Sequence, residues 1–169
     1  MIDNAIEKSS KKVVVFNLRN VDNPIIRSEI AGYILRKLFI LGKKLGDFNS
    51  VIVLEEAHNF APERGYGELS AGRENLSKLY AEKIASEGRK FGLGLIVVSQ
   101  RPAQVSKYVL SQTNTQVLFR IINDNDLNAI EKSIESVSRN IVDKLSDLKT
   151  GYAFVTGTGI EIPALVEIR

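Results

Sequence analysis

The stretch VIVLEEAH at residues 51–58 decides how this chain folds. Its first four residues form a short, mostly β-branched apolar run, which is typical of a buried strand in a parallel sheet. Two carboxylates, Glu55 and Glu56, come directly after that strand. Ligands of open parallel sheets bind at the carboxyl ends of the strands, where one carboxylate can hold the water shell of a Mg²⁺ ion and the next can activate an attacking water. An acidic first turn of a following helix, which the helix dipole favours, explains the same pair as well.

The rest of the chain alternates apolar runs with helical patterns. We expect further strands at 12–18, 93–98 and 116–121, helices at 24–45, 75–91, 105–110, 126–136 and 140–148, and a terminal hairpin at 151–168. The apolar stripe of the first helix consists of Ile26, Ile30, Ile34, Leu38, Leu41 and Leu45. Gly46 is expected to end this helix in the left-handed conformation. Strands separated by helices favour a parallel sheet with crossover connections, so the predicted fold class is α/β.

Composition indicates an ordinary globular protein. The chain has 169 residues, of which 44% are hydrophobic and 25% charged, and no repeat or linker divides it, so we predict a single domain over residues 1–169. No apolar run reaches the roughly 20 residues that cross a bilayer, and the N-terminus does not resemble a signal peptide. Cysteine is absent, which excludes disulfides and fits a cytoplasmic protein, and His58 alone cannot build a multi-histidine metal site. The net charge of +3 permits nucleic-acid contact without requiring it.

Two other segments carry polar groups that suit nucleotide chemistry. Ser99 and Gln100 directly follow the expected strand at 93–98, where a glutamine can hydrogen-bond a γ-phosphate or its attacking water. An ordinary polar turn accounts for the same pair. Arg89 lies in EGRKFG at residues 87–92, at the end of the expected helix. It either caps that helix by charge or is supplied as an arginine finger to the nucleotide of a neighbouring subunit.

Taken together, three motifs resemble one family. LEEAHN at 54–59, EGRKFG at 87–92 and VSQRP at 98–102 are similar to segments of the HerA-type ATPases, which are hexameric DNA translocases related to FtsK and to conjugation coupling ATPases. The resemblance runs from about residue 12 to about residue 168. It implies a partial RecA-like P-loop NTPase core with a mainly parallel sheet flanked by helices and a C-terminal β-hairpin.

The resemblance also implies roles for individual residues. Glu55 and Glu56 correspond to the Walker B pair, with Glu56 the catalytic glutamate and Glu55 holding Mg²⁺ through water. Gln100 corresponds to the sensor residue that contacts ATP, and Arg89 to the arginine finger that acts in trans. Further candidates for a contact with the γ-phosphate or with a neighbouring subunit are Arg101 and Arg120.

For the whole protein, the resemblance implies an ATP-driven translocase or helicase on double-stranded DNA that acts in end resection. Its partners would be further copies of itself in a hexameric ring and a NurA-type nuclease, with no membrane involved. Two alternatives remain open at this point. The chain could be a non-catalytic docking or regulatory scaffold with the same fold, or a secretion- or conjugation-type ATPase of the same superfamily.

One element of the family is missing from the 169 residues. The pattern Gly-x-x-x-x-Gly-Lys-Ser/Thr, whose backbone and lysine cradle phosphates, does not occur in them. We therefore expect the chain to be the C-terminal part of a longer polypeptide or a truncated relative of one, and to bind ATP weakly or not at all by itself. His58 is expected to be a local hydrogen-bonding group. Arg64, Arg73 and Lys78, in and after the long loop at 57–72, are expected to form a solvated basic surface, with a DNA channel as the alternative.

Overall fold

The structure is a computed structural model, and it describes residues 13–46, 48–65, 75–135 and 137–168. The chain divides into two compact units, Met1–Val98 and Ser99–Arg169, and each unit is described here by itself. Residues 66–74, which hold much of the expected long loop and include Arg73, lie outside the described residues. No helix in the described ranges is long and apolar enough to cross a membrane.

The first unit begins with a helix whose two ends are set by local sequence. Helix α2 covers Pro24–Leu45. At its start the side chain of Asn23 accepts hydrogen bonds from the amides of Ile25 and Ile26, at 2.9 and 3.2 Å, which satisfies two amide groups that lack helical partners. At its end Gly46 takes the expected left-handed conformation, with φ of 74°, and its amide donates to the carbonyl of Gly42.

The face that α2 buries differs from the predicted stripe. Ile34 is buried, but Ile26 and Leu45 at the two ends of the stripe are 49% and 57% exposed, so this part of the prediction is wrong. The buried face consists of Ser28, Ala31, Gly32, Ile34, Leu35, Phe39 and Gly42. Small residues on this face let helix α3, Leu76–Glu87, approach α2 closely. A short 3₁₀ turn, η3 at Gly88–Phe91, continues α3 to the end of the predicted helix.

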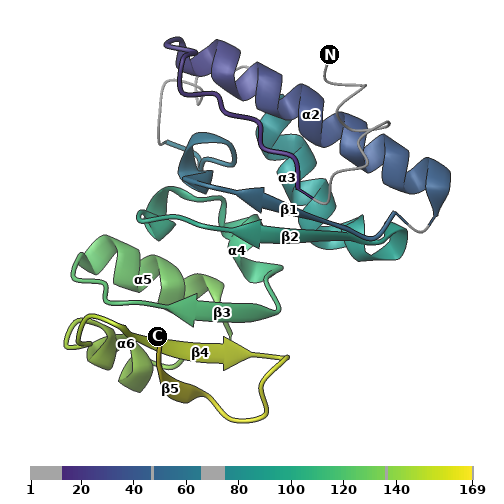
Figure 1. Cartoon of the computed structure of the whole chain (residues 1–169). Coiled ribbons are helices and arrows are strands. Elements are labelled where there is room, and N and C mark those ends of the chain that lie inside the picture. The colour runs from purple at the N-terminus through teal and green to yellow at the C-terminus, as the bar shows by residue number, and fades with distance from the viewer. Residues whose placement is uncertain (1–12, 47, 66–74, 136, 169) are drawn as a thin grey trace. The chain divides into compact units, whose positions relative to one another are not determined.

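Strands β1 (Ser50–Leu54) and β2 (Leu93–Val97) form the parallel pair that the sequence predicted. Helices α2 and α3 lie side by side on one face of this pair (Figure 1), where Leu54 and Leu93 are buried. On the opposite face Val51 and Val53 are 64% and 56% exposed. The expectation that this strand is buried on both faces is therefore wrong for the described residues.

The predicted strand at 12–18 is not observed. Residues 13–18 of the described chain run without regular secondary structure, and Val13 and Val15 are 74% and 80% exposed. A strand requires a hydrogen-bonded neighbour, and in the described part of this unit β1 and β2 pair only with each other. The apolar run alone was therefore not sufficient to make a strand.

The second unit opens with a 3₁₀ turn, η4 at Pro102–Gln104, and continues with two helical segments separated by a strand. Helix α4 covers Lys107–Ser111, strand β3 covers Thr115–Leu118 and helix α5 covers Asp124–Ser133. Asp126 of α5 accepts a hydrogen bond from the amide of Ala103 at 2.9 Å and so ties η4 to α5. Helix α6 (Arg139–Leu145) and the hairpin strands β4 (Tyr152–Gly157) and β5 (Ala164–Glu167) complete the unit.

The sheet of this unit has the order β3-β4-β5 and is antiparallel throughout. The β4–β5 pair is the predicted terminal hairpin. The β3–β4 pair departs from the expected parallel crossover because two helices, and not one, connect these strands. Two successive helices return the chain to the end of the sheet where β3 stops, so β4 runs the other way.

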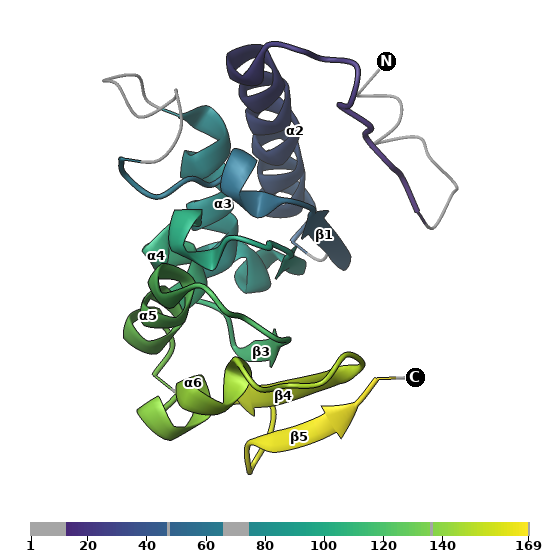
Figure 2. The same ribbon diagram turned by 90° about the vertical axis from the view of Figure 1, so that its left-hand side faces the viewer.

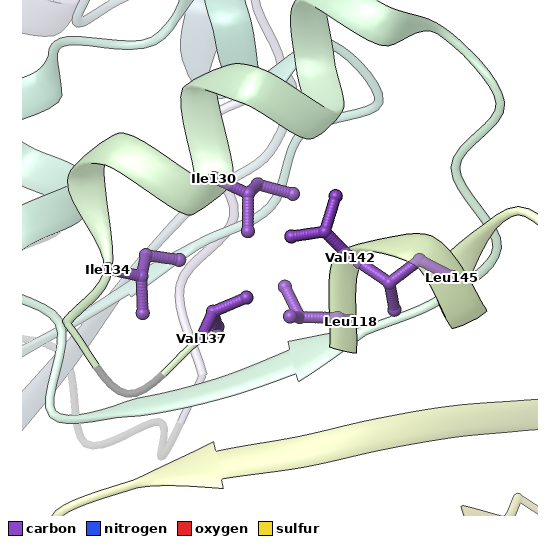
Figure 3. Packing of buried hydrophobic residues seen from close by; sticks show 6 residues of the cluster. All are labelled: Leu118, Ile130, Ile134, Val137, Val142 and Leu145. Carbon is purple, nitrogen blue, oxygen red and sulfur yellow. The ribbon is translucent and has the colours of Figure 1, made fainter. Parts of the chain in front are cut away.

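Helices α5 and α6 cover one face of this sheet (Figure 2) and enclose its core. The buried side chains of that core come from β3, α5, α6 and the connection between the helices (Figure 3). They are Leu118, Ile130, Ile134, Val137, Val142 and Leu145.

Candidate functional site

The carboxyl end of β1 carries an irregularity that places the two glutamates. The amide of Val98 donates to the carbonyl of Leu54 at 3.0 Å, and the carbonyl of Val98 accepts from the amide of Ala57 at 2.9 Å. In a regular parallel ladder the second bond would come from residue 56, because each residue bonds to the two neighbours of its partner. One extra residue is therefore inserted opposite Val98, which makes Glu55 and Glu56 a β-bulge at the end of the strand.

The bulge gives Glu56 a backbone conformation that few side chains adopt. Its φ and ψ are 50° and 51°, in the left-handed region, and it precedes the 3₁₀ turn η1 at Ala57–Asn59. A non-glycine residue in this region costs of order 1–3 kcal/mol and persists where surrounding contacts hold it. Here the holding contacts are the hydrogen bond from the amide of Ala57 to the carbonyl of Val98 and the complete burial of the Ala57 side chain. The segment after β1 is therefore a bulge and a 3₁₀ turn, and not the acidic first turn of a regular helix that the sequence also allowed.

The carboxylate of Glu56 lies against His58. Atom Oε2 of Glu56 is buried and lies 3.4 Å from Nδ1 of His58. The side chains of Glu56 and His58 are 40% and 16% exposed, so the contact is partly shielded from water. His58 therefore makes a local contact, as the sequence suggested. The side chain that it contacts is that of Glu56, the candidate catalytic glutamate.

Glu55 is exposed at the same strand end. Among the described residues no ion pair or hydrogen bond holds its carboxylate, so this group is accessible to a hydrated cation. Mg²⁺ in nucleotide sites keeps several water ligands and is held by one or two carboxylates together with substrate phosphates. An exposed carboxylate on a bulge at the carboxyl end of a parallel strand fits that requirement.

Arg89 lies at the opposite end of the parallel pair. It belongs to η3, which precedes β2, and β2 runs in register with β1 from Ser50↔Leu93 to Leu54↔Val97. The length of β1 alone, roughly 13 Å at 3.3 Å per residue, therefore separates Arg89 from the glutamates. Its side chain is exposed, and within the described ranges no hydrogen bond or ion pair holds its guanidinium. The structure does not bring Arg89 to the glutamates of its own chain.

The remaining candidates belong to the second unit. Gln100 and Arg101 are exposed in the turn that follows β2, where the amide of Arg101 donates to Oγ of Ser99 at 3.0 Å. Arg120 is exposed after β3, and its Nε donates to the carbonyl of Ser146 at the end of α6, at 3.1 Å. Arg120 therefore has a local role in joining β3 to α6.

The basic residues near the long loop are only partly described. Arg64 is exposed. Lys78 lies in the first turn of α3, 3.8 Å from the carboxylate of Glu82. This ion pair fits the prediction of an ordinary charged surface.

Sequence reasoning missed a polar cluster in the second unit. Arg139 lies 2.9 Å from Glu131 and 3.1 Å from Asp143. The hydrogen bond and charge of Glu131, with that of Asp143, raise the pKa of Arg139 above its ordinary value. The cluster borders an open depression of about 440 Å³ lined by Ile122, Asp124, Leu127, Asn128, Arg139, Val142, Asp143 and Ser146. The only hint of this cluster in the sequence was the four-residue spacing of Arg139 and Asp143. The same spacing of opposite charges is common on ordinary solvent-exposed helices, so it did not identify a site.

Comparison of the sequence with curated proteins finds relatives that match most of this chain. No protein-family model matches the chain. A DNA double-strand break repair helicase HerA from Sulfurisphaera tokodaii is 35% identical over 93% of this chain and 31% of its own length. The protein of the same name from Saccharolobus solfataricus is 35% identical over 96% and 32%, and that from Pyrococcus furiosus is 42% identical over 70% and 20%. The chain thus spans about a third or less of the length of these curated relatives.

Solved structures support the fold. The genome packaging NTPase B204 from Sulfolobus turreted icosahedral virus 2, in complex with ATP-gammaS, matches with a TM-score of 0.71 at 18% identity. The match covers 100% of this chain and 72% of that one. The complex of the same NTPase with AMPPCP gives the same TM-score. The chain therefore shares the fold of this solved NTPase, and the α/β class predicted from the sequence is confirmed.

Proposed function

Because the chain belongs to the HerA family over the stretch it spans, we propose that it is the water-activating part of an ATP-driven DNA translocase or helicase. The observation that carries this proposal is the bulge at the end of β1, which presents two adjacent carboxylates at the ligand-binding edge of a parallel sheet. We also propose that both units belong to one RecA-like core, that the protein acts in the cytoplasm, and that it functions within a longer polypeptide.

The two glutamates would have different tasks. Glu56 would orient the attacking water and accept its proton, because its left-handed backbone holds the carboxylate at the end of the strand. Glu55 would hold Mg²⁺ through water, since its carboxylate is exposed beside Glu56. When bound, Mg²⁺ neutralises the charge that develops on the phosphates of ATP.

Arg89 would serve the nucleotide of the next subunit. Its separation from Glu55 and Glu56 of the same chain by the length of β1 supports an action in trans. An arginine supplied in this way stabilises the charge of the transferring phosphoryl group. Such a role requires a ring or filament of subunits, and a hexamer is the assembly that we propose. Gln100 would sense the γ-phosphate, with Arg101 and Arg120 as further contacts to nucleotide or neighbouring subunit.

The names of the relatives suggest the substrate, and the partner is proposed from the family resemblance of the three motifs. Those proteins are named as helicases of DNA double-strand break repair. We therefore propose that the protein moves along double-stranded DNA and hydrolyses ATP. From the family resemblance we also propose a NurA-type nuclease as its partner in end resection.

The test is a Glu56→Gln variant in the native polypeptide that contains this chain. We expect kcat for DNA-stimulated ATP hydrolysis to fall about 100-fold or more, because the amide cannot accept the proton of water, while KM for ATP stays within about twofold. Glu29→Gln makes the same chemical change on the exposed side of α2 and should leave kcat unchanged. Full hydrolysis by Glu56→Gln would exclude Glu56 as the base. A wild-type polypeptide without any hydrolysis would favour the scaffold alternative.

A further inference from the structure

We propose that His58 is a positioning residue, which holds one oxygen of the Glu56 carboxylate through imidazole Nδ1 so that the other oxygen faces the attacking water. This inference rests on the proposed function of Glu56 and extends it to a second side chain. The observation behind it is the 3.4 Å approach of Nδ1 to the buried Oε2 atom.

The backbone between the two side chains is fixed, so the approach is built into the fold. The amide of Ala57 donates to the carbonyl of Val98, directly after β2, and the Ala57 side chain is fully buried. The η1 turn is closed by bonds from Asn59 to the carbonyl of Glu56, at 2.9 Å, and from Phe60 to that of Ala57, at 3.0 Å. The backbone of His58 therefore cannot move away from Glu56 without breaking the hydrogen bonds of this turn.

The two oxygens of the Glu56 carboxylate have different surroundings. Oε2 is buried, yet the side chain as a whole is 40% exposed, so its exposed surface lies on other atoms. A carboxylate held at one oxygen keeps a defined orientation for the lone pairs of the other. Hydrogen-bond partners that orient metal-ligating side chains are worth about 10- to 100-fold in metal affinity or activity, and we expect an effect of similar size for a partner that orients a general base. Contacts of this kind are often long before substrate binds and shorten in the reacting complex, which fits a separation of 3.4 Å.

The first test reads the contact directly and does not depend on hydrolysis. His58 is the only histidine in the sequence, so its imidazole nitrogen signals in a long-range ¹H–¹⁵N spectrum of this chain need no assignment. We expect Nδ1 to carry a proton and its signal to shift in Glu56→Gln, but to remain in place in Glu55→Gln. An Nδ1 atom that carries no proton, or an Nδ1 signal that does not shift in Glu56→Gln, would overturn the proposal.

The second test uses kinetics of the native polypeptide. His58→Ala should lower kcat for ATP hydrolysis about tenfold and leave KM for ATP unchanged. His58→Asn places an amide nitrogen close to the position of Nδ1 and should restore most of kcat, whereas His58→Gln, whose amide nitrogen lies near the position of Nε2, should not. Lys44→Ala, at the exposed end of α2, is the control.

The outcomes separate this proposal from the one on which it rests. Wild-type kcat in His58→Ala, or equal failure of the Asn and Gln variants, rejects a positioning role for Nδ1. Unchanged hydrolysis in Glu56→Gln rejects the catalytic role of Glu56 itself, and the spectrum then still decides whether the contact exists.

Discussion

Glu56 and Asn49 are the two non-glycine residues with positive φ in the described part of the chain. For Glu56 the strain has a clear origin, because the bond from Ala57 to the carbonyl of Val98 is reached only when an extra residue is accommodated at the bulge. The sequence predicted the glutamate pair at a strand end. It could not predict the left-handed conformation, because the contacts that enforce it come from a strand about 40 residues later in the chain.

Because Glu56 has a left-handed backbone, we expect glycine at this position to give a more stable protein than alanine, which is the reverse of the usual order. Glu56→Gly and Glu56→Ala both remove the side chain, but only glycine adopts φ of 50° without steric cost. We expect Glu56→Gly to be more stable than Glu56→Ala by about 1 kcal/mol in urea unfolding of this chain. The same pair of changes at Glu55, where φ is not positive, should give the opposite order. Equal stability of the two Glu56 variants would show that the fold does not enforce the left-handed conformation.

At the scale of elements, helix boundaries were more predictable than helix faces. Asn23, Pro24 and Gly46 are chemical signals for a start and a stop, and α2 begins and ends where they indicate. The buried face was predicted less well because hydrophobic periodicity gives no weight to Gly32 or Gly42. Gly32 is buried because the backbone of α3 packs directly against it, and Gly42 is buried because the side chains of Leu93 and Phe91 fill the space beside it. Packing of this kind depends on the partner element, which a single helical pattern does not contain.

The two buried glycines of α2 are expected to respond differently to replacement by alanine. A Cβ atom at Gly32 would lie 2.7 Å from the backbone nitrogen of Ser77, so Gly32→Ala forces α2 and α3 apart. Overpacking of this kind costs about 1–3 kcal/mol and the better helix propensity of alanine returns at most about 1 kcal/mol, so we expect a net loss in the free energy of unfolding. At Gly42 the nearest atom is the end of the Leu93 side chain, which can rotate away, so Gly42→Ala should be close to neutral. Urea titrations of the two variants make the comparison, and a neutral Gly32→Ala would contradict the described packing.

At the scale of the whole molecule, the exposed apolar face of β1 and β2 indicates an incomplete layer. Parallel sheets are covered on both faces in nearly all proteins, yet Val51, Val53 and Ile96 are at least half exposed in the described chain. The α/β class could be predicted from the sequence because strands and helices alternate in it. The absence of the strand predicted at 12–18 and the exposure of one sheet face could not be predicted, because both depend on which neighbouring elements are present and not on the segment itself.

The final prediction concerns the ATP affinity of this chain alone. Phosphate binding in P-loop proteins comes chiefly from the backbone amides and lysine of the glycine-rich loop, and that pattern does not occur in these 169 residues. We therefore expect the purified chain to bind ATP more weakly than about 1 mM in calorimetric titration, the upper end of ordinary enzyme KM values. The native polypeptide, detected in cell extracts with an antibody to this chain, should run well above 18.8 kDa and bind ATP in the micromolar range. Micromolar binding by the isolated chain, displaced by ADP, would show that its own residues form a complete phosphate site. A native product of 18.8 kDa without ATP affinity would support the scaffold alternative instead.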